Sequence, residues 1–140
     1  MGESMDAASH DVYFDVPGVA SVRWDDGQQL VLVEWQGWAN ATEFSELLEA
    51  EITALRKHHG TRILADCRRQ KVLNPADQDR ANREWLPRAL AAGLKCFAVV
   101  VPSSALADLN LKASLAKVPA NALKVGYFAT PEEARDWLGR

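Results

Sequence analysis

The sequence has few of the residues that build disulfide frameworks, and it has no long apolar run. Among its 140 residues are two cysteines, Cys67 and Cys96, which are too few for a disulfide framework. Reduced thiols suit the cytoplasm. No stretch approaches the roughly 18 uninterrupted apolar residues of a membrane-spanning helix, and the polar, acidic N-terminus does not resemble a signal peptide. We therefore expect a cytoplasmic protein without a membrane span.

Histidine is also scarce, and its positions argue against catalysis. A thiol nucleophile such as Cys67 needs a base, usually histidine. His58 and His59 close a predicted helix at the opposite edge of the fold, and His10 lies near the N-terminus. No Cys or Asp partner has metal-ligand spacing to these histidines, and the chain contains no glycine-rich phosphate loop. We predict a protein that is not an enzyme and uses no metal or cofactor, with Cys67 as a half-buried structural thiol.

The composition indicates one soluble domain. Apolar residues make up 48% of the chain and charged residues 25%, which is typical of a globular domain. We expect a flexible leader over residues 1–10 and a single domain over residues 11–140. No internal repeat or linker interrupts that domain.

The net charge of −3 is unevenly distributed. Residues 1–60 hold 11 acidic and 3 basic residues, whereas residues 61–140 hold 8 acidic and 13 basic residues. A nucleic-acid-binding domain is usually more basic than this, so we expect no nucleic-acid partner. The asymmetry favours either a face that accepts anions or self-association, with a homodimer as the commonest form. An unevenly charged, solvated surface is an equally good interpretation.

Strand and helix signals alternate along the chain. A hairpin is predicted around Asp26-Gly27, a strong two-residue turn signal. The alternation that follows predicts an α/β two-layer sandwich with a mixed, mostly parallel sheet of 4–5 strands, an N-terminal antiparallel hairpin strand and about four helices. The predicted strands cover residues 20–25, 28–35, 62–67, 95–102 and 123–128, with a possible short strand at residues 11–16. The first helix covers about residues 42–59, and the second opens at Asn74-Pro75 and ends at Gly93. The third covers roughly residues 104–117, and a short terminal helix opens at Thr130-Pro131.

Capping residues define the helix starts. Asn40 with Glu43 forms a capping-box pattern. Asn74 is followed by Pro75, a residue favoured in the first turn of a helix. Pro87 falls inside the same predicted helix, where it must either kink one helix or separate two.

Five tryptophans are candidates for core or pocket positions. Trp35, Trp85 and Trp137 lie at periodic positions that predict core packing. Trp24 lies on the hairpin, where we expect it to be half exposed. Trp38 follows a strand and is the best candidate for a pocket wall, although core packing is favoured even for this residue.

The carboxyl ends of the parallel strands form the predicted binding edge, because open α/β sheets bind ligands there. Helix N-termini with free N–H groups meet at the same edge and favour anions. The alternative is that the arginines are solvated and that Asp66 pairs with one of them or caps the loop. The predicted ligand-binding residues are Trp38, Asp66, Arg68, Arg69, Trp85, Ser103 and Ser104.

Four segments resemble SpoIIAA-like proteins, the branch of the STAS-domain fold (sulfate transporter and anti-sigma-factor antagonist) that borders on the CRAL-TRIO lipid carriers. They are LVLVEWQGW, ILADCR, DQDRANREWLPRALAAGLKCFAVVVP and VGYFATPEEARDWL, and together they cover roughly residues 20–139. The resemblance implies a mixed sheet of four or five strands with helices packed on it. It also implies either a regulatory module that docks a protein or a carrier of a small or lipidic ligand.

The phosphorylation switch of antagonist proteins does not carry over. In that family, the switch serine lies just after the strand that corresponds to RILADC. This chain has no serine or threonine between Thr61 and Ser103. Cys67, Arg68 and Asn74 stand where the switch residue is expected.

We therefore predict a non-enzymatic STAS-like regulatory or interaction module that acts by protein–protein binding, without the phospho-serine switch. The alternative is a small-molecule or lipid-type carrier or sensor. Its ligand would place an anionic head at Arg68 and Arg69 and an apolar body near Trp38 and Trp85.

Overall fold

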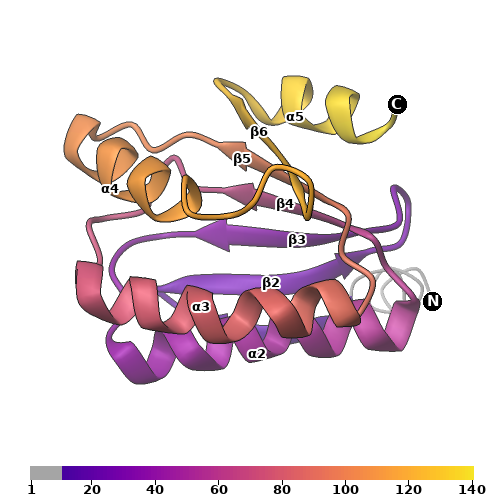
Figure 1. The fold of residues 1–140 in the computed structure, drawn as a ribbon, viewed down its shortest axis with the longest axis horizontal. Helices are drawn as coiled ribbons and strands as arrows, with labels where there is room; N and C mark the ends of the chain where they lie inside the picture. Colours follow the sequence, from indigo (N-terminus) through magenta and orange to yellow (C-terminus); the bar gives the residue numbers. More distant parts are fainter. Residues whose placement is uncertain (1–10) are drawn as a thin grey trace.

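A computed structural model describes residues 11–140, and the predicted leader at residues 1–10 lies outside them. The described chain forms one six-stranded sheet whose strands follow sequence order. Figure 1 shows this order for the strands that it labels. The four-to-five-strand prediction is extended by the short strand β1. The strands are β1 (Val12–Val16), β2 (Ala20–Asp25), β3 (Leu30–Trp35), β4 (Arg62–Asp66), β5 (Cys96–Val100) and β6 (Lys124–Phe128).

The sheet is mixed and mostly parallel, as predicted. β1, β2 and β3 pair antiparallel, whereas β3, β4, β5 and β6 pair parallel. The turn after β2 is longer than the predicted two-residue turn, because β3 begins at Leu30 rather than at residue 28. The Asp25 carboxylate accepts a hydrogen bond from the Gln28 N–H at 3.1 Å, and Gln29 adopts a left-handed conformation with φ of 58°. These two features close the wider turn.

Four helices complete the described fold: α2 (Ala41–His58), α3 (Pro75–Ala91), α4 (Ala105–Leu115) and α5 (Pro131–Leu138). The predicted caps are confirmed. Asn40 and Glu43 form a capping box, and Asn74 accepts hydrogen bonds from two N–H groups of the first turn of α3. Pro87 lies inside the single continuous helix α3 and does not separate two helices.

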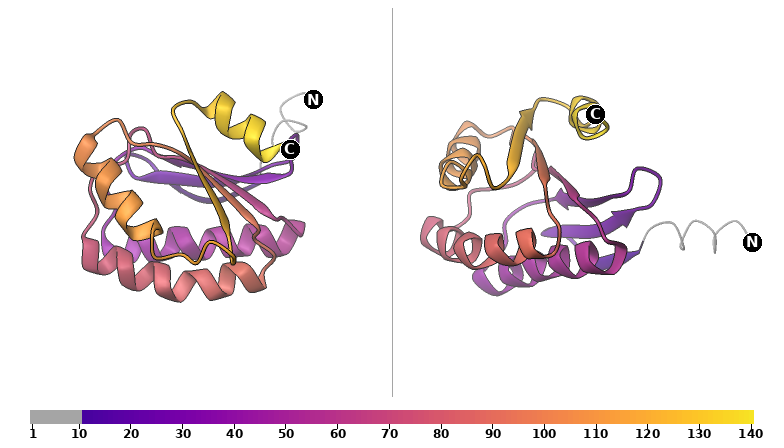
Figure 2. Two further views of the ribbon diagram at one scale, coloured as in Figure 1. Left: turned by 45° about the horizontal axis from the view of Figure 1, so that its top comes forward. Right: turned by 45° about the vertical axis from the view of Figure 1, so that its right-hand side comes forward.

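The helices are divided unequally between the two faces of the sheet. α2, α3 and α4 connect parallel strands and pack with the larger apolar core on one face (Figures 1 and 2). Right-handed crossovers between sequential strands place their helices on one side. α5 covers the other face with a smaller cluster that includes Leu64, Val100 and Leu138. Near the carboxyl ends of β3 and β4, that second face carries the polar side chains of the candidate site.

The tryptophans divide differently from the prediction. Trp35 and Trp85 are buried as expected. Trp24 is also buried, not half exposed, because its ring stacks on His58 of α2 with centroids 4.4 Å apart. Trp137 is only half-buried, because α5 lies at the margin of the smaller cluster. Trp38 is 51% exposed and does not pack in the core.

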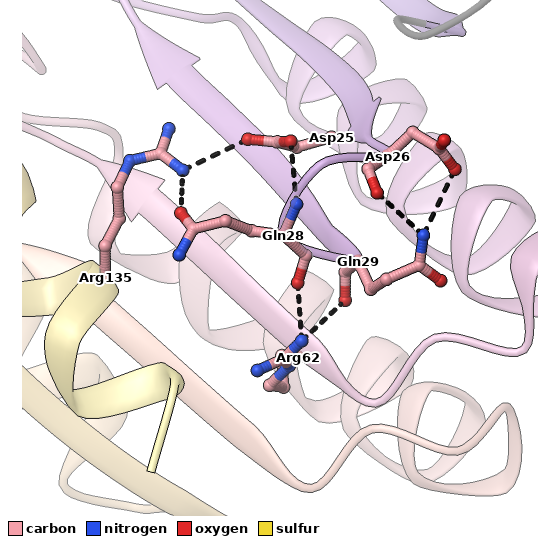
Figure 3. A network of polar contacts seen from close by, with 6 residues as sticks. All are labelled: Asp25, Asp26, Gln28, Gln29, Arg62 and Arg135. Atoms are coloured by element: carbon pink, nitrogen blue, oxygen red, sulfur yellow. Dashed lines mark hydrogen bonds and ion pairs between the residues drawn. The ribbon is translucent and has the colours of Figure 1, made fainter.

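Two arginines fix the β2–β3 turn to the rest of the fold (Figure 3). The Arg62 guanidinium donates to the carbonyl oxygens of Gln28 at 2.5 Å, Gln29 at 3.2 Å and Leu138 at 2.7 Å. Arg135 of α5 pairs with the Asp25 carboxylate at 3.0 Å and also bonds the Gln28 side chain. The hairpin turn and the C-terminal helix are thereby joined through the start of β4.

Candidate functional site

A polar groove opens at the carboxyl ends of β3 and β4, on the face of the sheet that carries α5. Its volume is about 510 Å³. Side chains alternate along a strand, so Glu34 and Asp66 point into the groove while their neighbours Val33 and Ala65 point into the core. The lining residues are Arg23, Glu34, Trp35, Gln36, Asp66, Arg68, Arg69 and Ser103.

Each carboxylate of the groove is paired with an arginine. Glu34 and Asp66 are register partners on β3 and β4, an arrangement that like charges alone would destabilise. Arg23 bonds Glu34 at 2.9 Å, and Arg68 bonds Asp66 through two nitrogens at 2.9 and 2.7 Å. The hydrogen bonds to Asp66 raise the pKa of the Arg68 guanidinium. These pairs offset the repulsion between the two acids.

Asp66 also organises the loop that follows β4. Its Oδ1 accepts the backbone N–H of Arg68 at 3.2 Å, and the Arg68 carbonyl in turn accepts the N–H of Ser103 at 3.1 Å. Both predicted alternatives for Asp66, pairing with an arginine and capping the loop, are therefore realised. This bonding fixes the loop after β4 against the loop after β5.

Arg69 supplies a positive charge that the carboxylates of the groove do not neutralise. Within residues 11–140 it makes no ion pair, whereas Arg23 and Arg68 each face a carboxylate. The five charged side chains that line the groove leave one net positive charge. Such a groove can attract a small anion, but two of its three guanidinium groups are already engaged.

The structure brings together only part of the predicted site. Asp66, Arg68, Arg69 and Ser103 line one groove. Ser104 instead caps α4, accepting the N–H of Ala107 at 3.3 Å.

Neither predicted tryptophan reaches the groove. Trp38 lies beside the starts of α2 and α3. Trp85 is buried on the opposite face of the sheet, packed against Phe97. An amphipathic ligand bound at Arg68 and Arg69 would therefore find neither of the apolar walls that we predicted.

Arg23, Glu34 and Gln36 are groove residues that the strand-end reasoning missed. Arg23 and Glu34 lie inside β2 and β3, not after them. The period-two pattern offered a signal, because both residues interrupt apolar strands at positions that must face away from the core.

The thiol of Cys67 lies in the core, in surroundings that favour its protonated form. Cys67 is fully buried rather than half-buried, and burial, with the nearby charge of Asp66, raises its pKa above the ordinary range. His58 lies at the opposite end of the sheet, where it bonds the Tyr13 hydroxyl at 2.7 Å and approaches Asp11 at 3.2 Å.

In the described range 11–140, no group of three potential ligand side chains could hold a metal ion. No helix in that range is long and apolar enough to cross a membrane.

The region expected to hold the phosphorylation switch is built for structure. Cys67 is buried, Arg68 is engaged by Asp66, and Asn74 caps α3. None of the three has a side chain that a protein kinase phosphorylates. This segment therefore cannot work as a phospho-serine switch.

An exposed apolar patch lies beside the carboxyl edge, on α4 and β6. Leu106 and Leu109 are 66% and 67% exposed, and Tyr127 is 39% exposed. The leucines are three residues apart and share one helix face. Lys112, one further step along that face, lies 5.5 Å from the centroid of the Tyr127 ring. We refer to Leu106, Leu109, Lys112 and Tyr127 as the α4–β6 patch.

The fold and this edge define a STAS-type α/β domain: a mostly parallel sheet, helices that begin at its carboxyl edge, and an antiparallel N-terminal hairpin. A family model described as SpoIIAA-like matches residues 30–139, which is well over half of the chain. The chain therefore belongs to the SpoIIAA-like family, as the sequence resemblance indicated. Neither the curated proteins nor the solved structures contain a match to it.

Proposed function

We propose that this protein is a non-enzymatic regulatory or interaction module that binds a protein partner, or a second copy of itself, through the α4–β6 patch. Membership of a STAS-type family supports an interaction module in general terms. The particular surface is argued from the side chains of α4 and β6. Because the switch segment lacks a phosphorylatable residue, binding is not controlled by a phospho-serine at that position.

The exposure of Leu106 and Leu109 is the observation that carries this proposal. Two large aliphatic side chains, each about two-thirds exposed, share one face of an 11-residue helix. Tyr127 of the edge strand β6 is also exposed, and its ring centroid lies 5.5 Å from Nζ of Lys112 on α4. Contiguous exposed apolar side chains with a polar rim mark interaction surfaces, and aromatic residues are enriched among the residues that dominate binding energy. Asp108, which forms an ion pair at 3.2 Å with Lys112 of the patch, supplies part of that rim.

We expect that Leu106→Lys combined with Leu109→Lys abolishes recovery of the partner. The parent and the double variant would be purified through the same affinity tag from the cells that produce the protein, and partner recovery per mole of bait would be compared. Recovery should fall about tenfold or more, because charged side chains cannot be desolvated in an apolar contact. Thermal midpoints should remain close to those of the parent, since both leucines face water.

Val12 provides the matched control. It is an apolar residue, 55% exposed, on the edge strand at the other end of the sheet. Val12→Lys should leave recovery unchanged. Equal recovery with the parent and with the leucine double variant would rule out the patch as the docking surface.

Binding of a small anion in the groove is the second candidate function. Arg69, which makes no ion pair within the described residues, favours it. We expect inorganic phosphate to bind weakly at low ionic strength. Arg68→Ala with Arg69→Ala should abolish this binding while the fold remains intact, because both side chains lie on a surface loop. Isothermal titration calorimetry would measure the loss, which should exceed about tenfold.

The control for the arginine variants removes the same charge elsewhere. Arg80 and Arg83 are exposed on α3 and lie outside the groove. Arg80→Ala with Arg83→Ala should bind phosphate as the parent does. Unchanged phosphate affinity after the loss of Arg68 and Arg69 would show that the groove is not an anion site.

A further inference from the structure

A second cavity lies inside the larger core, between the sheet and the helices α2, α3 and α4. Its volume is about 40 Å³. Apolar side chains form most of its wall, including Phe44, Leu48 and Phe97. It is separated from the charged groove by the sheet, and it plays no part in the proposed docking surface.

Three residues that line this cavity each have a buried polar atom with no hydrogen-bond partner within residues 11–140. The atoms are Glu51 Oε1, Gln78 Oε1 and Trp85 Nε1. Each of these residues is more than nine-tenths buried. Unpaired buried polar groups are uncommon in native proteins, and here three of them, from two helices, share one cavity. This concentration points to a molecule that bonds all three.

The cavity carries little charge at neutral pH. Glu51 and Cys67 are the titratable residues in its wall. Burial raises the pKa of Glu51 to about 8 and raises the pKa of the Cys67 thiol further. Both groups are therefore mainly protonated near pH 7. A charged ligand would lose its hydration without gaining an opposite charge, so the fitting ligand is neutral.

We propose that this cavity binds the primary carboxamide head of a small neutral molecule. A carboxamide offers two N–H donors and one carbonyl acceptor. The carbonyl can accept the indole N–H of Trp85, and one N–H can donate to Gln78 Oε1. The neutral Glu51 carboxyl group can both donate to the carbonyl and accept the remaining N–H. The head thus satisfies all three unpaired atoms without placing a charge in the core.

The size of the cavity and its position between α3 and α4 agree with this ligand class. A cavity needs a volume of roughly 10–15 Å³ to hold one water molecule. The volume of about 40 Å³ therefore accommodates the three heavy atoms of a carboxamide head. Asn82 lines both this cavity and a neighbouring one of about 50 Å³, where Leu86 and Val118 form an apolar wall for the ligand's body.

Two polar contacts close the boundary between α3 and the end of α4. Asn82 bonds Ser114 at 2.6 Å, and Lys117, just past α4, pairs with Asp79. The Asp79–Lys117 pair lies at the surface, and Ser114 is buried beneath it. Neither contact involves a strand, so both can open without disturbing the sheet. This boundary is the expected route by which a ligand reaches the cavity.

The test uses propionamide as the probe and the indole ¹H–¹⁵N signal of Trp85 as the readout, with that signal assigned by Trp85→Phe. Propionamide should shift the signal saturably. N,N-dimethylpropionamide has the carbonyl but no N–H donor, and it should bind at least tenfold more weakly. Gln78→Met keeps the side-chain length and removes the amide, so it should weaken propionamide binding about tenfold. Glu84→Met, on the exposed side of α3, should have no effect.

Three results would overturn the proposal. A Trp85 signal that propionamide does not move saturably, together with nuclear Overhauser contacts from the indole N–H to water, would mean that the cavity holds ordered water only. Equal affinity for the two amides would mean that the N–H donors are not recognised. Unchanged propionamide affinity in Gln78→Met would remove Gln78 from the site. If that variant does not fold, the comparison of the two amides on the parent protein decides.

Discussion

Replacing Glu51 with glutamine should stabilise the protein at alkaline pH and remove much of the pH dependence of its stability. Burial raises the pKa of Glu51 from its ordinary value of 4.5 to about 8. Between these two values the folded state keeps a proton that the unfolded state releases. The free energy of unfolding therefore falls as pH rises through this range, and the full stability from this group is present only below about pH 4.5. Glutamine has the same shape and does not titrate.

The effect is expected to be large. Each unit of difference in pKa corresponds to about 1.4 kcal/mol, so Glu51 ionisation costs the folded state on the order of 5 kcal/mol by pH 9. Urea unfolding at about pH 5, 7 and 9 would measure it. The parent should lose stability progressively, whereas Glu51→Gln should lose much less. Glu46→Gln, on the exposed face of α2, should follow the parent. Parallel curves for the parent and Glu51→Gln would contradict the assignment of a neutral buried carboxyl group.

Replacing Arg62 with methionine should cause the second large change, a loss of roughly 3 kcal/mol in the free energy of unfolding. Methionine keeps the apolar stem of the side chain but removes the guanidinium. The carbonyl groups of Gln28 and Gln29 then lose this donor (Figure 3). The carbonyl group of Leu138 loses it as well. Because hydrogen bonds from charged groups are the stronger ones, the hairpin turn and the end of α5 should both loosen.

Two measurements check the role of Arg62. Urea unfolding gives the change in stability, with Lys124→Met as the control because Lys124 is exposed at the equivalent end of β6. Hydrogen exchange locates the change, which should appear in the β2–β3 turn and in α5. A loss below about 0.5 kcal/mol, the size typical of surface substitutions, would show that Arg62 does not hold these segments together.

Local signals in the sequence were sufficient for most of the fold. The Asn40–Glu43 capping box and the Asn74-Pro75 pair place the starts of α2 and α3 within a residue. The apolar runs of β4 and β5 identify buried parallel strands. The effect of Pro87 was not predictable, because whether a helix tolerates an internal proline depends on the tertiary contacts that hold both halves.

The candidate site was only partly predictable, because the sequence does not state which face of the sheet a helix covers. Asp66 and Arg68 follow a strand and could be placed at its carboxyl end. Trp85 could not be excluded from that edge until α3 was seen to pack on the opposite face.

Glu51 left a signal that was missed. It falls seven residues after Phe44 and four before Leu55, within the apolar stripe of α2. An acid at such a position must either be buried or interrupt the stripe. That placement could have indicated a polar group in the core before the structure was known.

Native mass spectrometry of the protein, purified gently from the cells that produce it, tests the proposed interaction module most directly. We expect a noncovalent assembly containing this chain with a partner protein or a second copy, and we expect the Leu106→Lys, Leu109→Lys double variant to appear as a single chain under the same conditions. A parent protein that appears as a single chain, without a partner or a second copy, would contradict the proposed function.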